Sequence, residues 1–436
     1  MSFVPVALQL LALLLAAPAT PASSMASPAM PTSLIASRVP HQDARLASSN
    51  QTAVLPAGSH LQLRLTSALS SATSRSGDRV SAVLTVDAAA SGLVVPAGTI
   101  VRGVVRQAAA FSWSTPQALL WLDFRELLSV SERRDESGRS IPIVTRVVAV
   151  DNARETVDQD GRILGITPPR EAPSSAEGAV LLAALAPELY DFARAEFSFR
   201  ELERPDIVYA AGTDFVLETL TATRDVPAVA ARADPMPDRE LLAIAAAQPL
   251  RTSAGTPPRP ADVINLVFSA SEVALQHAFN TAGWNTAVAL GLRADVKTVL
   301  AVAVDRGYKL GPVSLQSLNG RRPDHVFQKQ TNTFDRRHHI RIWRATERYQ
   351  GQPVWAASAT HDIGIKFVRE ERTFTHRVEQ VIDLERQKIV DDLRYTGSVV
   401  GYALERRPGV PTQLTNATED VMTTDGKVAV IVLRPR

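Results

Sequence analysis

The chain has 436 residues, of which 45% are hydrophobic and 21% are charged, and its formal net charge is +2. This length exceeds one ordinary domain, and the composition is that of a globular chain rather than a disordered one. The small net charge gives no electrostatic reason to expect a nucleic-acid or membrane-surface partner, and the absence of cysteine excludes disulfides, thiolate nucleophiles and cysteine-ligated metals.

The first residues predict an export signal. Val4 to Ala17 is almost wholly apolar, and Ala17-Pro18-Ala19 and Thr20-Pro21-Ala22 both resemble the small-x-small pattern of signal-peptidase cleavage. The apolar stretch is shorter than the roughly 20 residues of a bilayer span. An uncleaved anchor is the alternative, because no Lys or Arg precedes the stretch.

These features predict a signal peptide over 1–22 and a flexible Ala/Ser/Pro-rich leader over 23–52. They also predict an exported protein of the bacterial periplasm or cell envelope, with no transmembrane helix once the signal is removed. That location disfavours nucleic acid as a partner.

Residues 53–225 predict a β-rich domain. Apolar and polar residues alternate over 61–66 and 80–86, as in strands with one buried face. Pro-Ala-Gly at 56–58 and 96–98, and Ala-Ala-Gly at 210–212, each precede a strand-like run. We interpret these as turns, with proline at the second position and glycine at the fourth. The expected fold is mainly β, a barrel or a sandwich, interrupted by a helix at Ala176–Phe192.

The string LPAGSHLQLRL…RSGDRVSAVL…GLVVPAGTIVRGVV, from Leu55 to Arg106, resembles the strand repeats of TrbI-like proteins of conjugation and type IV secretion. The resemblance implies a β-barrel of the cell envelope. A generic barrel or sandwich with the same turns stays open as the alternative.

A proline-rich stretch over 226–260 predicts a linker that holds a short helix at Asp238–Ala247. Residues 261–436 then predict an α+β domain with a mixed sheet. Its first helix follows the strand Val263–Phe268 and is expected to be capped by Ser269 and Glu272. Asp383 is expected to cap a later helix that ends at Tyr395. The remaining expected elements are a helix at Ala294–Arg306 and strands at His339–Trp343, Val354–Thr360, Thr373–Glu379, Val399–Leu404 and Lys427–Leu433.

Residues 262–399 resemble the C-terminal domain of LssY-type proteins. The strings that carry the resemblance are DVINLVFSAS…AFNTAGW, PVSLQSLNGRRPDHVFQK, RRHHIRIWR, PVWAASATHDIGI and THRVEQVIDLERQKIVDDL. In that family the domain occurs alone or behind a membrane phosphatase-like domain, and the resemblance implies no established activity. A β-rich region precedes it in this chain, so a role taken from the membrane-fused relatives does not transfer.

Histidines and carboxylates gather in this second half. Imidazole and carboxylate ligands suit zinc, iron or manganese, and a divalent metal is therefore a possible cofactor. Strand alternation sends His338 and His339 to opposite faces, so the candidate metal ligands are His339 with His361 or Asp362, and His376. No HExxH or similar compact motif is present. The alternative is that these histidines are structural and bond to backbone and carboxylates. Asp383 and Glu385 are interpreted as helix-capping residues.

The segment Arg321–Arg348 holds eight basic and three acidic residues. Guanidinium groups bind phosphate and carboxylate in bidentate fashion, so a concave basic surface is one prediction and a solvated hairpin with locally paired arginines is the other. The candidate ligand-binding residues are Arg336, Arg337, Arg341 and Trp343.

The sequence therefore favours an envelope protein that binds an anionic ligand or a protein partner through its second half. One alternative is a metal-dependent hydrolase, with phosphoesters as a possible substrate class. The other is an accessory component of a secretion or conjugation assembly. Whether the chain is an enzyme stays open, because no GxSxG, P-loop, Ser-x-x-Lys or GxGxxG pattern is present.

Overall fold

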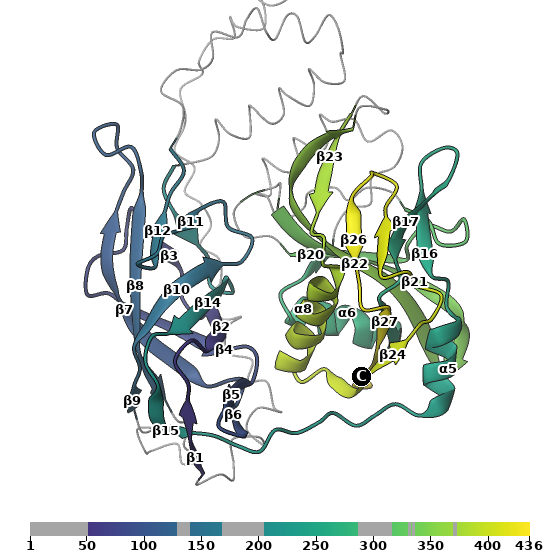
Figure 1. Cartoon of the computed structure of the whole chain (residues 1–436), viewed down its shortest axis with the longest axis horizontal. Helices are drawn as coiled ribbons and strands as arrows, with labels where there is room; N and C mark the ends of the chain where they lie inside the picture. The colour runs from purple at the N-terminus through teal and green to yellow at the C-terminus, as the bar shows by residue number, and fades with distance from the viewer. Residues whose placement is uncertain are drawn as a thin grey trace, which may run out of the picture. The chain divides into compact units, whose positions relative to one another are not determined.

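The computed structural model (Figure 1) describes residues 51–128, 140–167, 205–286, 316–329, 333, 336–368 and 373–436. Val39–Arg436 form one compact unit. The predicted signal peptide and nearly all of the leader lie outside the described residues, as do the helices predicted at Ala176–Phe192 and Ala294–Arg306. No helix in the described ranges is long and apolar enough to cross a membrane.

One nine-stranded antiparallel sheet organises the N-terminal half. Its strands are β2 (His60–Leu65), β4 (Arg79–Leu84), β7 (Ile100–Ala109), β8 (Leu119–Leu128), β9 (Ser140–Pro142), β10 (Thr145–Val150), β11 (Thr156–Val157), β12 (Arg162–Leu164) and β14 (Asp214–Thr219). They follow the order β10-β14-β2-β4-β7-β8-β12-β11, and β9 pairs with β8. The hydroxyl of Thr145 donates to the carbonyl oxygen of Phe124 at 2.9 Å and ties β10 to β8. The sheet is therefore nearly closed, which confirms the predicted barrel-like fold.

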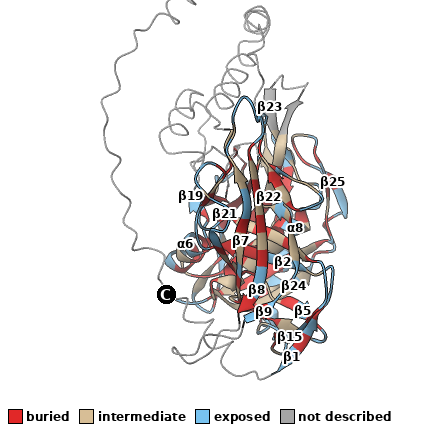
Figure 2. Cartoon of the chain, turned by 90° about the vertical axis from the view of Figure 1, so that its left-hand side faces the viewer, coloured by how far each residue is buried: buried red, intermediate tan, exposed pale blue. Residues whose placement is uncertain are grey.

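The predicted alternation builds the core of this barrel-like sheet. Leu61, Leu63 and Leu65 on β2 are buried together with Phe124 on β8 and Phe215 on β14. Figure 2 shows buried residues along the strands. Because successive side chains of a strand point to opposite faces, this apolar set fixes which face of each strand turns inward.

The glycines of the repeated turns confirm their structural role but not their predicted positions. Gly58, Gly98 and Gly212 have φ values of 77°, 92° and 95°. The N–H of Thr99 donates to the carbonyl oxygen of Pro96 at 3.2 Å. Proline is therefore the first residue of this turn and glycine the third, where a type II turn needs a positive φ. The prediction of second and fourth positions was wrong.

A mixed sheet organises the C-terminal half. Its strands are β18 (Leu266–Ser269), β19 (Asn285–Thr286), β20 (His325–Lys329), β21 (Arg336–Tyr349), β22 (Gln352–Val368), β23 (Thr373–Val378), β24 (Val399–Arg406) and β27 (Lys427–Leu433). They follow the order β19-β20-β21-β22-β18-β27-β24, and β23 pairs with β22. β18 and β27 run parallel while the other neighbours run antiparallel. This arrangement confirms the α+β prediction.

Helices cover both faces of the mixed sheet. α6 (Glu272–Thr281) and α8 (Ile382–Tyr395) pack on one face, where Leu275 and Ile389 join the same core as Ile340. α5 (Arg239–Ala247) packs on the other face through Leu241 against Val430. The stretch predicted as a linker thus contributes a helix that covers this sheet.

Short two-stranded pairs complete the described structure. They are β1 (Thr52–Leu55) with β15 (Thr223–Pro227), β3 (Leu69–Ser70) with β13 (Val208–Tyr209), β5 (Ala88–Ala90) with β6 (Leu93–Val95), β16 (Arg251–Ala254) with β17 (Arg259–Val263), and β25 (Gln413–Thr415) with β26 (Val421–Thr423).

Two predicted helix caps were wrong. α6 is capped by Ser271, whose hydroxyl accepts from the N–H of Ala274 at 3.2 Å, because Ser269 is still paired within β18. α8 begins at Ile382 without a side-chain cap. Asp383 instead accepts from the hydroxyl of Thr424 at 2.8 Å and joins the helix to the loop that follows β26. Asp238, the first residue of the helix predicted at Asp238–Ala247, is the N-cap of α5 and accepts from the N–H of Leu241 at 3.1 Å.

The β21–β22 hairpin sorts its polar residues onto two faces. His338 pairs with His361, while the next positions along, Arg337 and His339, pair with Asp362 and Thr360. His338 and His361 therefore share the face that α8 covers, and the flanking residues lie on the opposite face. The pairing is irregular between Arg344 and Arg348, close to the turn.

Candidate functional site

His338 lies between two carboxylates that come from different halves of the chain. Its Nε2 is 3.0 Å from both oxygens of Asp151, which follows β10, and its Nδ1 is 2.6 Å from Oε2 of Glu385 on α8. Burial alone would lower the pKa of His338, but the two carboxylates raise it to about 10. His338 is therefore an imidazolium that donates from both nitrogens.

His361 is the neutral neighbour of this imidazolium. The two rings stack with centroids 4.3 Å apart. Nε2 of His361 lies 2.6 Å from Oδ1 of Asn152, so it donates to that amide oxygen. Burial and the positive charge of His338 lower the pKa of His361 to about 3. The His338–His361 pair thus places a charged and an uncharged imidazole in contact.

A buried network of five charged side chains, called the ion network below, adjoins these histidines. Its members are Arg64 on β2, Asp214 on β14, Lys329 on β20, and Lys388 and Asp392 on α8. Oδ2 of Asp214 lies 2.8 Å from Nζ of Lys329 and 2.8 Å from Nζ of Lys388. Arg64 bridges the two carboxylates, with Nε 2.7 Å from Asp214 and Nη2 2.9 Å from Asp392. The network therefore joins the barrel-like sheet to the mixed sheet.

Asp214 and Lys388 are held charged by their neighbours in this network, whereas burial lowers the pKa of Lys329. Burial would raise the pKa of Asp214, but Arg64, Lys329 and Lys388 hold it well below its usual range. Burial would lower the pKa of Lys388, but Asp214, Asp392 and Asp151 raise it. A buried ion is tolerated only when it is paired and hydrogen-bonded, so loss of one member leaves its partners uncompensated.

A second polar cluster, the Asp362 cluster, lies on the opposite face of the hairpin. Oδ2 of Asp362 is 2.9 Å from Nε of Arg337, 3.5 Å from Nδ1 of His339 and 3.8 Å from Nδ1 of His376. Burial lowers the pKa of His339 well below its usual value. Burial would raise the pKa of Asp362, but His339, His376 and Arg337 lower it.

The structure brings together three of the four candidate metal ligands. His339, Asp362 and His376 meet in the Asp362 cluster, while His361 lies on the opposite face beside His338. Arg337 already donates to the shared carboxylate. Metal binding by the four predicted residues together would need ligands from both faces of one sheet. Metal binding by the Asp362 cluster alone stays a prediction.

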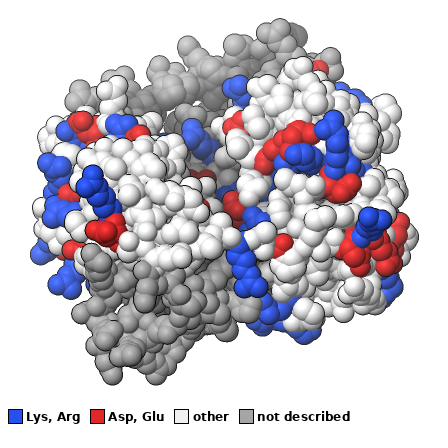
Figure 3. Space-filling view, turned by 60° about the horizontal axis from the view of Figure 1, so that its bottom comes forward, with Lys and Arg blue, Asp and Glu red and all other residues white. Residues whose placement is uncertain are grey.

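The four candidate ligand-binding residues do not form an exposed basic surface. Arg337, Arg341 and Trp343 are 3%, 2% and 1% exposed, and only Arg336 is exposed. Arg341 pairs with the buried Asp262 at 3.4 Å. The prediction of a concave basic surface was therefore wrong, because inward strand positions turn these guanidinium groups toward internal carboxylates. On the face shown in Figure 3, Lys and Arg are interspersed with Asp and Glu.

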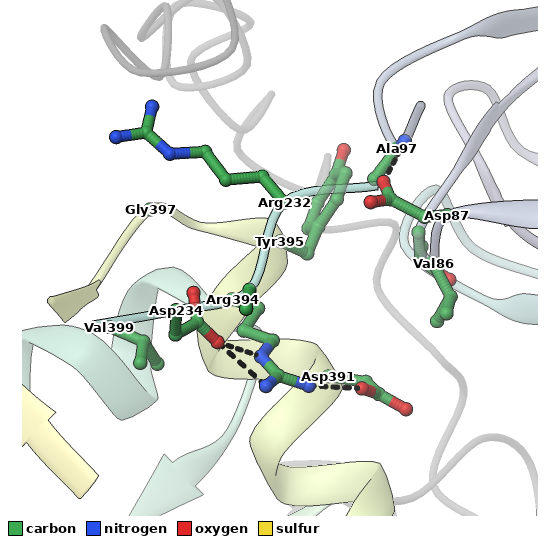
Figure 4. A pocket seen from close by; sticks show the side chains of 12 residues that line it. Val86, Asp87, Ala97, Arg232, Asp234, Asp391, Arg394, Tyr395, Gly397 and Val399 are labelled. Carbon is green, nitrogen blue, oxygen red and sulfur yellow. Dashed lines mark hydrogen bonds and ion pairs between the residues drawn. The ribbon is translucent and has the colours of Figure 1, made fainter. Parts of the chain in front are cut away.

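A pocket of about 210 Å³ lies beside the last turn of α8 (Figure 4). Arg394 pairs there with Asp234 at 2.6 Å and with Asp391 at 3.7 Å. The side chain of Arg232 extends away from these ion pairs. Burial raises the pKa of Asp391 to about 6. Tyr395, over whose ring Arg64 lies, borders the pocket and connects it to the ion network.

Several residues of the site escaped the sequence analysis. The sequence analysis singled out none of Asp151, Asn152 and Lys388 as a candidate site residue. Glu385 was interpreted as a helix-capping acid, although its side chain bonds to His338. Asp151 and His338 are 187 residues apart, and no local pattern encodes a contact of that range.

The fold and the site together define a two-part protein, with a barrel-like sheet and an α+β domain that share a buried ionic interface. Residues 247–428 match the family model described as the LssY C-terminus, so the second half of the chain is similar to that domain. The match confirms the resemblance inferred for residues 262–399 and extends it on both sides. A comparison with curated proteins gave no match. The TrbI-like resemblance stays a prediction. Residues 247–428 are called the LssY-like domain below.

Proposed function

We propose that this chain is an exported envelope protein whose LssY-like domain binds an anionic ligand at Lys329, His338 and Lys388. The observation that carries the proposal is that these cations already form ion pairs with carboxylates of the barrel-like sheet and its loops. Asp214 contacts both lysines at 2.8 Å, and Asp151 contacts His338 at 3.0 Å. A phosphate or carboxylate group of a ligand would present negatively charged oxygens to these cations, as the side chains of Asp214 and Asp151 do.

The strength of such a site comes from its burial. The exposed fraction of the side chain is 11% for Lys329, 19% for Lys388 and 5% for His338. Charges attract more strongly in such surroundings than in water. Because Asp151 and Asp214 occupy the cations, the ligand has to displace carboxylates of the same chain. Removal of one such carboxylate should therefore strengthen ligand binding.

Calorimetric titration with inorganic phosphate, in the presence of a chelator, tests the proposal on the full chain. We expect saturable binding that Lys388→Gln weakens and that Asp214→Asn strengthens at least tenfold, or about 1.4 kcal/mol. The matched control is Asp123→Asn, which removes a carboxylate paired with Arg125 at the surface.

Two results would contradict anion binding at these cations. One is the absence of saturable phosphate binding in both the wild type and Asp214→Asn. The other is an equal affinity of Asp214→Asn and Asp123→Asn, because the internal carboxylate would then not compete with the ligand.

The export part of the proposal is supported by the apolar segment Val4–Ala17 and the small residues that follow it. Expression in a Gram-negative bacterium should release a mature chain into the periplasm, with an intact mass that corresponds to cleavage after Ala19 or Ala22. A chain of full mass in the membrane fraction would favour the uncleaved anchor, and one in the cytoplasm would refute export.

A further inference from the structure

We propose that His338, His361 and Glu385 form a binding site for a divalent transition metal, with zinc as the best match. One ligand atom from each side chain lies within 4.8 Å of the other two. Two imidazoles and one carboxylate are a ligand set of catalytic zinc sites, which leave a fourth position open. This site differs from the Asp362 cluster and does not depend on the anion-binding proposal.

An unpartnered oxygen of Glu385 points independently to a ligand. The side chain of Glu385 is 2% exposed. Its Oε2 accepts from His338, but its Oε1 is buried and has no hydrogen-bond partner within the described ranges. A buried acceptor without a partner costs free energy. A cation beside Glu385 would satisfy this oxygen.

The chain holds the three ligands from neighbouring elements. His338 and His361 are directly opposite each other on β21 and β22, and α8 packs against β22 with Glu385 in its first turn. Around a tetrahedral zinc ion the ligand atoms are about 3.3 Å apart, as bonds of 2.0–2.1 Å require. Small side-chain rotations therefore suffice to close the site.

Two residues outside the ligand set have the contacts that metal-bound histidines make. Asp151 accepts from Nε2 of His338, which leaves Nδ1 and Glu385 to face the ion. Such a carboxylate–histidine–metal arrangement orients the ring and increases its basicity. Asn152 bonds to Nε2 of His361 in the same manner. Both residues come from the turn after β10, so the barrel-like sheet would help to orient the metal ligands.

Charge balance permits the exchange of a proton for a metal. The proton between Nδ1 of His338 and Oε2 of Glu385 leaves to solvent when the ion takes its place, and the histidine becomes a neutral ligand. The net gain is one positive charge. It falls beside the carboxylates of Glu385 and Asp151, which stabilise it. A zinc ion there would supply the Lewis acid that a metal-dependent hydrolase needs.

Zinc titration of the chelator-treated, untagged full chain tests the site, with elemental analysis after equilibrium dialysis as the readout. We expect one ion per chain. Loss of a ligand in His361→Ala or Glu385→Gln should weaken binding by more than the roughly 100-fold that loss of an outer partner can cost. His339→Ala and His376→Ala are the matched controls, because both lie on the opposite face and should retain zinc.

Cobalt supplies a second readout if a variant proves unstable. Co²⁺ bound in the wild type should give the visible absorption of a tetrahedral site, and His361→Gln should lose that absorption while its circular dichroism is retained. The proposal is overturned if the wild type binds no stoichiometric metal, or if His339→Ala and His376→Ala lose zinc while His361→Ala retains it. Phosphate binding is measured with chelator present, so the two proposals can fail separately.

Discussion

Nζ of Lys388 on α8 lies 2.8 Å from Oδ2 of Asp214 on β14, a contact between residues 174 positions apart. Lys388→Met would leave the buried Asp214 and Asp392 without one of their cations. We expect a loss of about 3–5 kcal/mol in the free energy of unfolding, measured by chemical denaturation. Arg125→Met, which removes an exposed partner of Asp123, should cost less than about 1 kcal/mol. Equal losses would show that the ion network adds no stability.

The buried position of Arg341 predicts a structural rather than a ligand-binding role. Arg341→Met leaves Asp262, which is 2% exposed, without its ion-pair partner. Unfolding free energy should fall by about 3–5 kcal/mol, while phosphate affinity stays unchanged. Arg322→Met, at an exposed position, should change stability by less than about 0.5 kcal/mol. A stable Arg341→Met variant with weakened phosphate binding would contradict this role.

Gly103 on β7 is required by the close approach of β8. A Cβ atom there would lie 2.2 Å from the carbonyl oxygen of Asp123 and 2.6 Å from Cα of Phe124. Gly103→Ala should therefore destabilise the chain by about 3 kcal/mol or more, as expected for overpacking against backbone. Gly58→Ala, whose Cβ would meet nothing within 4 Å at a φ of 77°, should cost only about 1–2 kcal/mol. Thermal and chemical denaturation of both variants measure these two losses of stability.

Asp391 should make stability depend on pH. Burial raises its pKa from 3.8 to about 6 in the folded state. The folded chain therefore binds the extra proton, and the stability that this gives is complete below pH 3.8 and is lost as the pH rises through 6. Asp391→Asn should remove this dependence. Relative to the wild type it should gain about 2.4 kcal/mol between pH 4 and pH 7. Denaturation curves of both proteins at these two pH values test the prediction, and a constant difference would refute it.

Local sequence patterns predicted the strands and helices well, because neighbouring residues largely determine where a strand or helix forms. Alternation placed Leu61 and Leu63 inside the barrel-like sheet, and the helix predicted at Asp238–Ala247 matches α5. The start of α6 was misplaced because Ser269 and Ser271 both precede the helix, and only the pairing of β18 with β22 shows that Ser269 still belongs to the strand.

The site was harder to predict because its contacts are long-range. Strand alternation separated His338 from His339, and the predicted grouping of His339 with Asp362 and His376 is present, but no local pattern identified the partners of His338. The partners of His338 are Asp151, from the turn after β10, and Glu385, from a helix of the same domain. Strand pairing also placed His361 beside His338 rather than beside His339. Only the pairing of strands and helices in the folded chain determines which residues lie beside each histidine.

The irregular pairing between Arg344 and Arg348 has a consequence for how this hairpin tolerates changes in length. From Arg344 to Arg348, β21 advances four positions while β22 advances two, so a one-residue deletion there can be absorbed without exchanging the sides occupied by His338 and His339. Between His339 and Arg344 the pairing is regular, and a one-residue deletion there would turn the two histidines to the opposite faces. The imidazole now enclosed by Asp151 and Glu385 would then lie on the face of Asp362, although no residue of the site had been substituted.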